Sequence, residues 1–293
     1  MDNRAPPPPA RRKARLEVLA IGAETFSDPR FGRIAFAERD AEDLARFFRD
    51  RLVDPTSAPA ARFEPDRVRV RALVNSQLTA ASVASALDEL GKSGRDGSLA
   101  ADDVVVVVIE SHYLEVGSQR LLATAEADDG HPAPPSVHAG ELGDRLGELA
   151  GLGCRVFVFV DAVHAVKQEG WDHEIKEWVR QLQARSKVAA FLASEHEPSL
   201  GGLDGHRVFA QAMLDVSRAR ADGRAGKATG PVSLFDFQRT VIDGALELSD
   251  RRQRAQFYLP ETLSIRAPFL DRPRPGILGP RSGPDASVEG ARR

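Results

Sequence analysis

Two histidines follow closely on two strongly apolar segments of the chain. His112 lies shortly after 104–109 (VVVVVI), and His164 lies shortly after 155–160 (RVFVFV). If these segments are neighbouring parallel strands, their carboxyl ends meet at the same edge of a sheet, where sites usually lie. An imidazole at that edge would be placed to act as the general base for a nucleophile on the adjacent strand. The residue at the nucleophile's position is Val163, whose side chain cannot attack a carbonyl group.

Neither of two other candidate nucleophiles is predicted to replace it. The single cysteine, Cys154, precedes the second apolar segment. Nine residues of extended chain span about 30 Å, so its thiol is expected at the opposite end of the sheet, as a buried apolar group. Ser111 is adjacent to His112, and neighbours on a strand point to opposite faces.

The sequence favours no cofactor or metal. Neither a dinucleotide-binding glycine pattern nor a phosphate-binding loop follows the first predicted strand, where Gly22 stands alone. One cysteine permits neither an intramolecular disulfide nor a cysteine metal site. Of the seven histidines, none are paired at helical spacing; His131, His138 and His173 are interpreted as surface residues. We therefore predict no cofactor and no metal.

The elements that must position the candidate residues alternate between strand-like and helix-like patterns. Predicted strands cover 16–21, 68–74, 104–109, 155–160, 188–192 and 257–259, and a hairpin is expected within 114–124. Predicted helices cover 36–52, 79–90, a stretch ending near 150, 171–185, 208–219 and 234–248, and Thr79 is the predicted N-cap of the second. This alternation is typical of an α/β fold, with a mostly parallel sheet of about six strands and helices on both faces.

Both ends of the chain differ in composition from the middle. Residues 1–15 form a proline-rich basic arm, and 264–293 form a tail rich in proline and glycine. Both are predicted to be disordered, because they cannot bury enough apolar surface to offset the entropy lost on ordering. Residues 16–263 are predicted to be one domain.

Composition narrows the class of protein. The 293 residues are 42% hydrophobic and 28% charged, with a formal net charge of −3, which argues against general nucleic-acid binding. No apolar run is long enough for a signal peptide or a membrane span. A cytoplasmic protein that binds neither nucleic acid nor membranes is therefore expected.

The residues at the two strand ends resemble motifs of the caspase and metacaspase superfamily of cysteine peptidases. That family reads Ser-Gly-His-Gly after its third strand and Asp-x-Cys-His-Ser-Gly after its fourth, where this chain has Glu110–Tyr113 and Asp161–Ala165. His112 matches the catalytic histidine and Val163 the nucleophilic cysteine. They are 51 residues apart, close to the spacing of about 50 in caspases.

Further segments extend the resemblance over roughly 16–263. These are Glu38–Ala41, Ala193–Ser194, Gly205–Phe209 and Gln253–Pro260. The resemblance implies a caspase-like three-layer sandwich and a degenerate, bacterial-type member of the superfamily.

The departures from the family pattern imply lost catalysis. Without the thiol, the covalent route of a cysteine peptidase is absent. Tyr113 occupies the oxyanion-hole position that glycine holds in the family, and its side chain is expected to fill or reshape the cleft.

A pocket for a basic side chain is also implied by the resemblance. Asp40 and Asp161, with Ser194 nearby, match positions that line this pocket in metacaspase-like members, and two carboxylates suit an arginine or lysine. The alternative from the residues alone is that Asp40 caps its own helix and Asp161 accepts hydrogen bonds from nearby backbone amides. Both interpretations stay open.

Three functions remain as alternatives. The leading hypothesis is a pseudoprotease: a catalytically inactive caspase-like domain that binds or regulates, with a basic peptide, a second copy, or an active relative as partner. An edge strand near Phe257 would offer a surface for pairing. The others are a caspase-family endopeptidase with an unrecognised nucleophile, and a structural scaffold whose cleft is occluded.

Overall fold

The computed structural model describes residues 12–28, 31–57, 61–116, 119–127, 136–164, 171–186, 188–194, 205–221 and 231–271. Most of the predicted N-terminal arm and C-terminal tail lie outside these ranges. His131 and residues 117–118 of the predicted hairpin lie outside them too.

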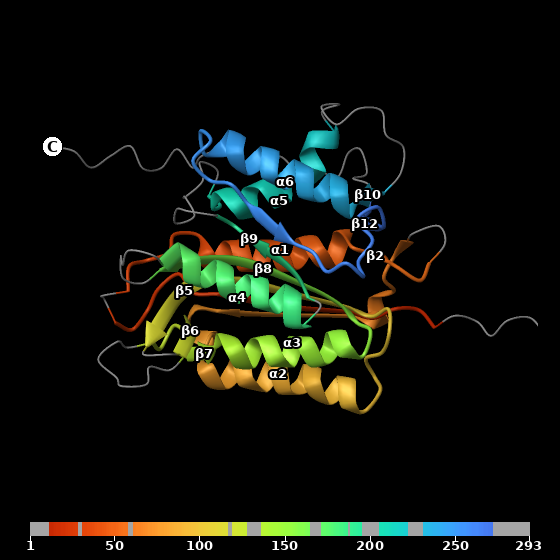
Figure 1. Ribbon diagram of the computed structural model, residues 1–293, viewed down its shortest axis with the longest axis horizontal. Helices are drawn as coiled ribbons and strands as arrows, with labels where there is room; N and C mark the ends of the chain where they lie inside the picture. Colours follow the sequence, from red (N-terminus) through yellow and green to blue (C-terminus); the bar gives the residue numbers. More distant parts are fainter. Residues whose placement is uncertain are drawn as a thin grey trace, which may run out of the picture.

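A single large sheet forms the middle of the molecule (Figure 1). Its main path runs β11–β9–β8–β5–β1–β4, and β6 and β7 are attached through β5. The pairs β4–β1, β1–β5, β5–β8 and β8–β9 are parallel, whereas β9–β11, β5–β6 and β6–β7 are antiparallel. The strands are β1 (Leu16–Gly22), β4 (Val68–Val74), β5 (Val104–Val116), β6 (Gln119–Ala123), β7 (Ser136–His138), β8 (Arg155–His164), β9 (Ala189–Leu192) and β11 (Gln256–Tyr258).

Helices cover both faces of the sheet, which gives three layers (Figure 1). On one face lie α1 (Ala37–Arg51), α5 (Val208–Ala221) and α6 (Leu234–Leu248). On the other lie α2 (Ala80–Arg95), α3 (Ala139–Gly151) and α4 (Trp171–Ser186). The prediction of an α/β fold with a mostly parallel sheet is confirmed.

The continuous apolar run of β5 explains its central place. Val104, Val106 and Val108 pack into the core under α1, α5 and α6, while the residues between them pack into the core under α2, α3 and α4. A strand buried on both faces needs apolar residues at every position rather than at alternate ones. The pattern therefore predicted both the strand and its position.

Two local features shape the chain near the candidate site: a helix cap at Thr79 and a close contact at Gly22. Thr79 caps α2 with a capping box, in which its side chain accepts from the Ser82 amide, as predicted. Gly22 ends β1 where α1 crosses it, and a β-carbon there would lie 2.5 Å from the Ala37 carbonyl oxygen. Glycine is therefore needed at Gly22 by close packing.

The two central strands extend further than predicted. We expected them to end at Ile109 and Val160, but β5 continues to Val116 and β8 to His164. The extra residues pair with each other in register, from Glu110 opposite Asp161 to Tyr113 opposite His164. Ladder pairing outweighs the polar character of these residues, so the candidate residues lie inside strands rather than in loops.

The predicted domain boundaries need correction at both sides. Within the predicted tail, β12 (Pro268–Leu270) pairs with β10 (Val232–Ser233), and Phe269 and Leu270 are buried. Within the predicted arm, Arg12 forms a 2.9 Å ion pair with the buried Asp103. The folded unit includes these residues because they have partners in the core that composition does not reveal. A short hairpin, β2 (Val53–Asp54) and β3 (Ala61–Arg62), was also not predicted.

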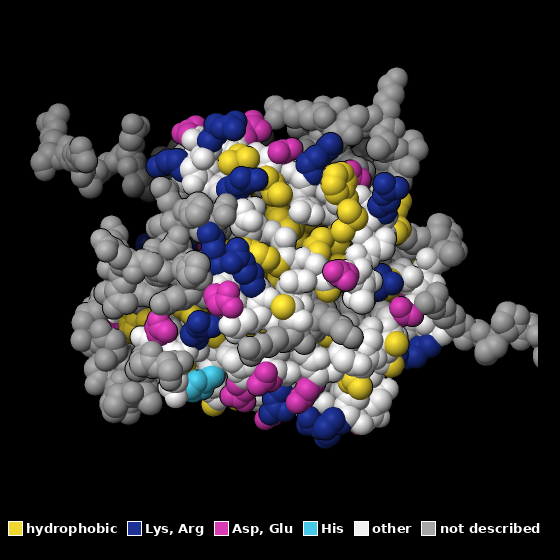
Figure 2. Space-filling model, in the orientation of Figure 1, with side chains coloured by type: hydrophobic (Ala, Val, Ile, Leu, Met, Phe, Trp, Pro, Cys, Tyr) yellow, Lys and Arg dark blue, Asp and Glu magenta, His cyan; other side chains and the backbone are white. Residues whose placement is uncertain are grey.

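Some of the exposed apolar side chains lie on or beside α6. Figure 2 shows hydrophobic side chains in the upper part of this face, around α6, among Lys and Arg side chains. Phe235 and Leu248 of α6 and the neighbouring Ile265 are each at least 40% exposed. None of the helices in the described ranges is long and apolar enough to cross a membrane.

Candidate functional site

His112 and Val163 lie directly opposite each other on adjacent parallel strands. They are register partners of β5 and β8, and residues opposite each other in a sheet point to the same face. The two strand ends therefore meet as the sequence indicated. The residue beside the imidazole is a valine, which offers neither a proton nor a lone pair.

The imidazole of His112 is enclosed by backbone carbonyls and aromatic rings. Its Nδ1 lies 3.0 Å from the Val163 carbonyl oxygen, and its Nε2 lies 2.6 Å from that of Gly32. The ring centroids of Phe26 and Phe31 are 4.8 and 5.8 Å from that of His112. Only 4% of the residue is exposed.

These contacts do not suit a general base. A carbonyl oxygen only accepts hydrogen bonds, and a neutral imidazole has one N–H donor. Both contacts of His112 can be hydrogen bonds only when both ring nitrogens carry protons, a state that cannot remove a proton from a nucleophile. In the neutral ring, the second nitrogen still faces a carbonyl oxygen instead of an acid group.

The side chains on either side of His112 point to the opposite face. Ser111 is fully buried and donates from Oγ to the Ala123 carbonyl oxygen at 2.6 Å. Tyr113 is fully buried in the core between the sheet and α2 and α3. The expectation that the tyrosine side chain fills the cleft is therefore wrong, because strand alternation turns it away from His112.

The cysteine lies at the other end of the sheet. Cys154 directly precedes β8, whereas Val163 is near the end of that strand. Its Sγ is 3.4 Å from the Ala100 carbonyl oxygen, and burial raises the pKa of the thiol to about 11. Such a thiol is almost entirely protonated at neutral pH and is a poor nucleophile.

The two aspartates predicted to line a pocket are both completely buried. Asp161 forms an ion pair with Arg207, with 2.8 Å between Oδ1 and Nη2. Asp40 accepts a hydrogen bond from the Arg207 backbone amide at 2.9 Å, and its Oδ1 lies 2.6 Å from Nδ1 of His206. The structure thus joins Asp40 and Asp161 through one short segment at the start of α5.

Asp40 does not cap its own helix. The N-terminal cap position of α1 is Phe36, which has a φ of 71° and makes no side-chain capping bond. Burial raises the pKa of Asp40, while the hydrogen bonds from His206 and Arg207 oppose that rise. Its carboxylate therefore links α1 to the start of α5.

A third buried carboxyl group belongs to the same cluster. Glu110 is the register partner of Asp161 and is 1% exposed. Burial, followed by the charges of Asp161 and Asp40, raises the pKa of Glu110 well above its usual value. Its Oε2 has no hydrogen-bond partner among the described residues. A protonated Glu110 suits this position, because it is buried beside two other carboxyl groups.

Three members of this cluster were not predicted as site residues: Glu110, His206 and Arg207. The sequence feature that could have identified them is a charged residue directly next to an apolar segment. Glu110 continues an uninterrupted apolar strand, and Arg207 directly precedes the apolar start of α5. A charge at such a position needs a partner of opposite sign, but the sequence does not identify which one.

Ser194 follows β9 and is half-buried at the same edge of the sheet. The residues directly after it, 195–204, lie outside the described ranges. Its predicted place beside the acidic pair therefore stays a prediction.

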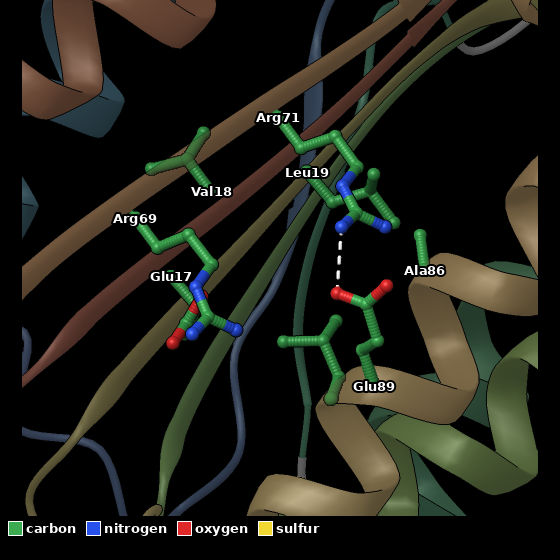
Figure 3. A pocket seen from close by; sticks show the side chains of 8 residues that line it. Glu17, Val18, Leu19, Arg69, Arg71, Ala86 and Glu89 are labelled. Carbon is green, nitrogen blue, oxygen red and sulfur yellow. Dashed lines mark hydrogen bonds and ion pairs between the residues drawn. The ribbon is translucent and has the colours of Figure 1, made fainter.

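A cavity elsewhere in the sheet contains another buried carboxylate. Glu17 of β1 lies with Arg69 and Arg71 of β4 and Glu89 of α2 around a space of about 20 Å³, enough for one water molecule (Figure 3). This cavity lies beside the early part of β1, away from the strand ends that carry His112. Within the described ranges, no group of three or more His, Cys, Asp or Glu residues is arranged to hold a metal ion.

Comparison with known proteins gives matches among solved structures. No protein-family model matches the sequence, and no curated protein matches it. A protein of Geobacter sulfurreducens is similar with a TM-score of 0.55 and 17% identity, over 88% of this chain and 98% of that one. The Drosophila initiator caspase Dronc is similar with a TM-score of 0.50 and 11% identity, over 88% and 84% of the two chains.

Proposed function

We propose, from the premise that this chain has a caspase-like fold, that it is a pseudoprotease: a binding or regulatory module without cysteine-peptidase activity. The observation that carries the proposal is the pairing of His112 with Val163 on adjacent strands. A caspase-type reaction needs a thiolate beside the imidazole, and valine removes the covalent step altogether.

The surroundings of His112 support the same proposal. Its two ring nitrogens face the carbonyl oxygens of Val163 and Gly32, and two phenylalanine rings pack against the imidazole. A substrate carbonyl would need space next to this ring, which the chain's own residues fill. The two alternative nucleophiles, the Ser111 hydroxyl and the Cys154 thiol, do not lie beside the imidazole of His112.

The proposal is tested by measuring peptide cleavage by the purified full-length chain. We expect no turnover of Arg- or Lys-containing reporters above background, with or without calcium. An active peptidase of the same fold serves as positive control, and His112→Ala shows whether any residual signal depends on the imidazole. Cleavage that is present in the wild type and lost in His112→Ala would establish a peptidase instead.

Partner binding through a sheet edge is part of the proposal. β11 pairs with β9 on one side and, among the described strands, has no neighbour on its other side. An open strand edge can pair with another chain, either a second copy or an active relative. Sedimentation velocity over a range of concentrations tests the homodimer, and a concentration-independent monomer would exclude it.

A basic peptide as partner requires a further condition. Asp40 and Asp161 are already engaged by His206 and Arg207 in this structure. A basic side chain would therefore have to displace Arg207 to reach Asp161.

The occluded scaffold is the second candidate function, and the enclosure of His112 and of the acidic pair favours it. The cytoplasmic location stays a prediction.

A further inference from the structure

The side chain of Arg207 is buried against Asp161. We call the site of Asp40 and Asp161, which the sequence predicted to bind a basic side chain, the acidic pocket. The Arg207 side chain is 2% exposed, and its Nη2 lies 2.8 Å from Oδ1 of the fully buried Asp161. A guanidinium group has five N–H donors in a planar arrangement that matches a carboxylate. Buried here, Arg207 fills the space that an external basic side chain would need and pairs with the carboxylate that would bind it.

The backbone that carries Arg207 is also anchored to the pocket. The Arg207 amide donates to Oδ2 of Asp40 at 2.9 Å, and Nδ1 of His206 lies 2.6 Å from the other oxygen of Asp40. Both oxygens of Asp40 are therefore used by two consecutive residues. Nε2 of His206 also lies 3.4 Å from Oδ2 of Asp43, one turn further along α1.

The turn before these residues directs them into the pocket. Gly205 has a φ of +80°, a left-handed conformation that glycine adopts readily and other residues rarely adopt. α5 starts directly afterwards at Val208, in the main core. Arg207 is thus held between a constrained turn and a buried helix.

We propose that Arg207 is a built-in ligand of the acidic pocket and keeps Asp161 and Asp40 from binding the arginine or lysine side chain of another protein. The ligand class of the pocket is a guanidinium cation, supplied here by the chain itself. This inference rests on the proposed function, because it treats the acidic pair as part of a binding cleft. Peptidase activity in the wild type would defeat the proposed function without showing where Arg207 lies.

The test empties the pocket and offers it a small guanidinium. Arg207→Ala is expected to lower the melting temperature by about 10 °C, because it removes the guanidinium that forms an ion pair with the buried Asp161. Methylguanidinium at about ten times its dissociation constant should recover part of that loss, since it binds only the folded state. Methylammonium, which lacks the planar donor set, should recover less.

Two variants separate pocket binding from general effects of the salt. Phe209→Ala removes a fully buried side chain from the same helix and should lower the melting temperature comparably, without recovery in methylguanidinium. The double variant Arg207→Ala with Asp161→Asn should also show no recovery, because the carboxylate that binds the cation is gone. The wild type should not bind N-acetyl-arginine amide in a titration followed by NMR.

A measurement on the wild type covers the case in which Arg207→Ala does not fold. The Arg207 guanidinium should give NMR signals that exchange slowly with water and rotate slowly about the Nε–Cζ bond. Signals that behave as those of an exposed arginine would overturn the proposal. So would a folded Arg207→Ala that methylguanidinium does not stabilise more than it stabilises Phe209→Ala.

Discussion

Two successive pairs of residues lie across β5 and β8 on the same face of the sheet, and their surroundings are opposite in character. Glu110 and Asp161 form the first pair, in a cluster of buried charges around Arg207. His112 and Val163 form the second, beneath two phenylalanine rings and against two backbone carbonyls. A single residue on each strand, Ser111 on β5 and Ala162 on β8, separates them.

The difference teaches which polar groups this edge of the sheet can hold. The carboxylate of Asp161 is held where Arg207, directly before α5, pairs with it inside the fold. The second pair has one polar side chain, and the backbone and aromatic rings surround it. Neither pair presents an exposed polar side chain, and this is the arrangement on which the proposed loss of peptidase activity rests.

The largest effect is expected at the charged pair. Asp161→Asn keeps the size of the side chain but removes the carboxylate that lies 2.8 Å from the buried guanidinium of Arg207. Breaking a buried ion pair from one side typically costs about 3–5 kcal/mol. We expect a loss of that size in the free energy of unfolding, measured by urea denaturation at neutral pH.

An ion pair at the surface provides the control for this prediction. Arg71 and Glu89 are separated by 2.6 Å, but their side chains are 35% and 47% exposed. Glu89→Gln should therefore cost at most about 1 kcal/mol. Equal losses for Asp161→Asn and Glu89→Gln would mean that the buried cluster contributes no more than a surface pair.

The fold could be predicted from the sequence because its main signals are local. The run at 104–109 predicted a central strand, and it is one. Thr79 predicted a helix start, and its capping box is present. The strand ends were wrong because pairing between β5 and β8 extends both strands. That pairing is a long-range effect which no local pattern contains.

A smaller effect of opposite sign is expected at Glu110. Its pKa is raised in the folded state, so the folded protein binds this proton more tightly than the unfolded chain does. Stability is then lost as the pH rises from the ordinary range of a glutamate toward the raised pKa. Glu110→Gln cannot ionise and should gain roughly 1 kcal/mol at neutral pH relative to the wild type.

Measurement at two pH values checks this sign. The gain of Glu110→Gln should be largest at neutral pH and should shrink near pH 4, where the wild-type carboxyl group is protonated in both states. Urea denaturation of the two proteins at both values gives the difference. A variant that is less stable than the wild type at neutral pH would indicate that ionised Glu110 contributes to the binding of Arg207.

A still smaller gain is expected at Glu17. Burial raises its pKa, but Arg15 and Arg69 each lie within 3.9 Å and partly compensate its charge, and the cavity beside it has room for one water (Figure 3). Glu17→Gln should therefore change the free energy of unfolding by about 0.5 kcal/mol in the same direction as Glu110→Gln. If Glu17→Gln gained more free energy of unfolding than Glu110→Gln, the two nearby arginines would not compensate the charge of Glu17 as we infer.

The candidate site was predictable in its positions but not in its contacts. The motif spacing placed His112 beside Val163, and the strand register agrees. The enclosing residues Phe26 and Phe31 come from a loop with no motif, so the sequence did not predict them. The pairing of Asp161 with Arg207 joins positions far apart in the chain, and composition alone cannot select that arginine among the others.

The last prediction concerns the reactivity of a thiol introduced beside His112, which we expect to equal that of an ordinary cysteine. Val163→Cys places a thiol beside His112, because the two positions are register partners on one face. The imidazole nitrogens already face carbonyl oxygens, so we expect no ion pair between thiolate and imidazolium to lower the pKa of the new thiol.

In a Cys154→Ala background, alkylation of this thiol, followed by mass spectrometry, should therefore become slow below about pH 8, as for an ordinary cysteine. Fast alkylation at pH 6 that is lost with His112→Ala would contradict the prediction. It would show that the imidazole is available once sulfur is present, and that the second pair differs from an active site by a single side chain.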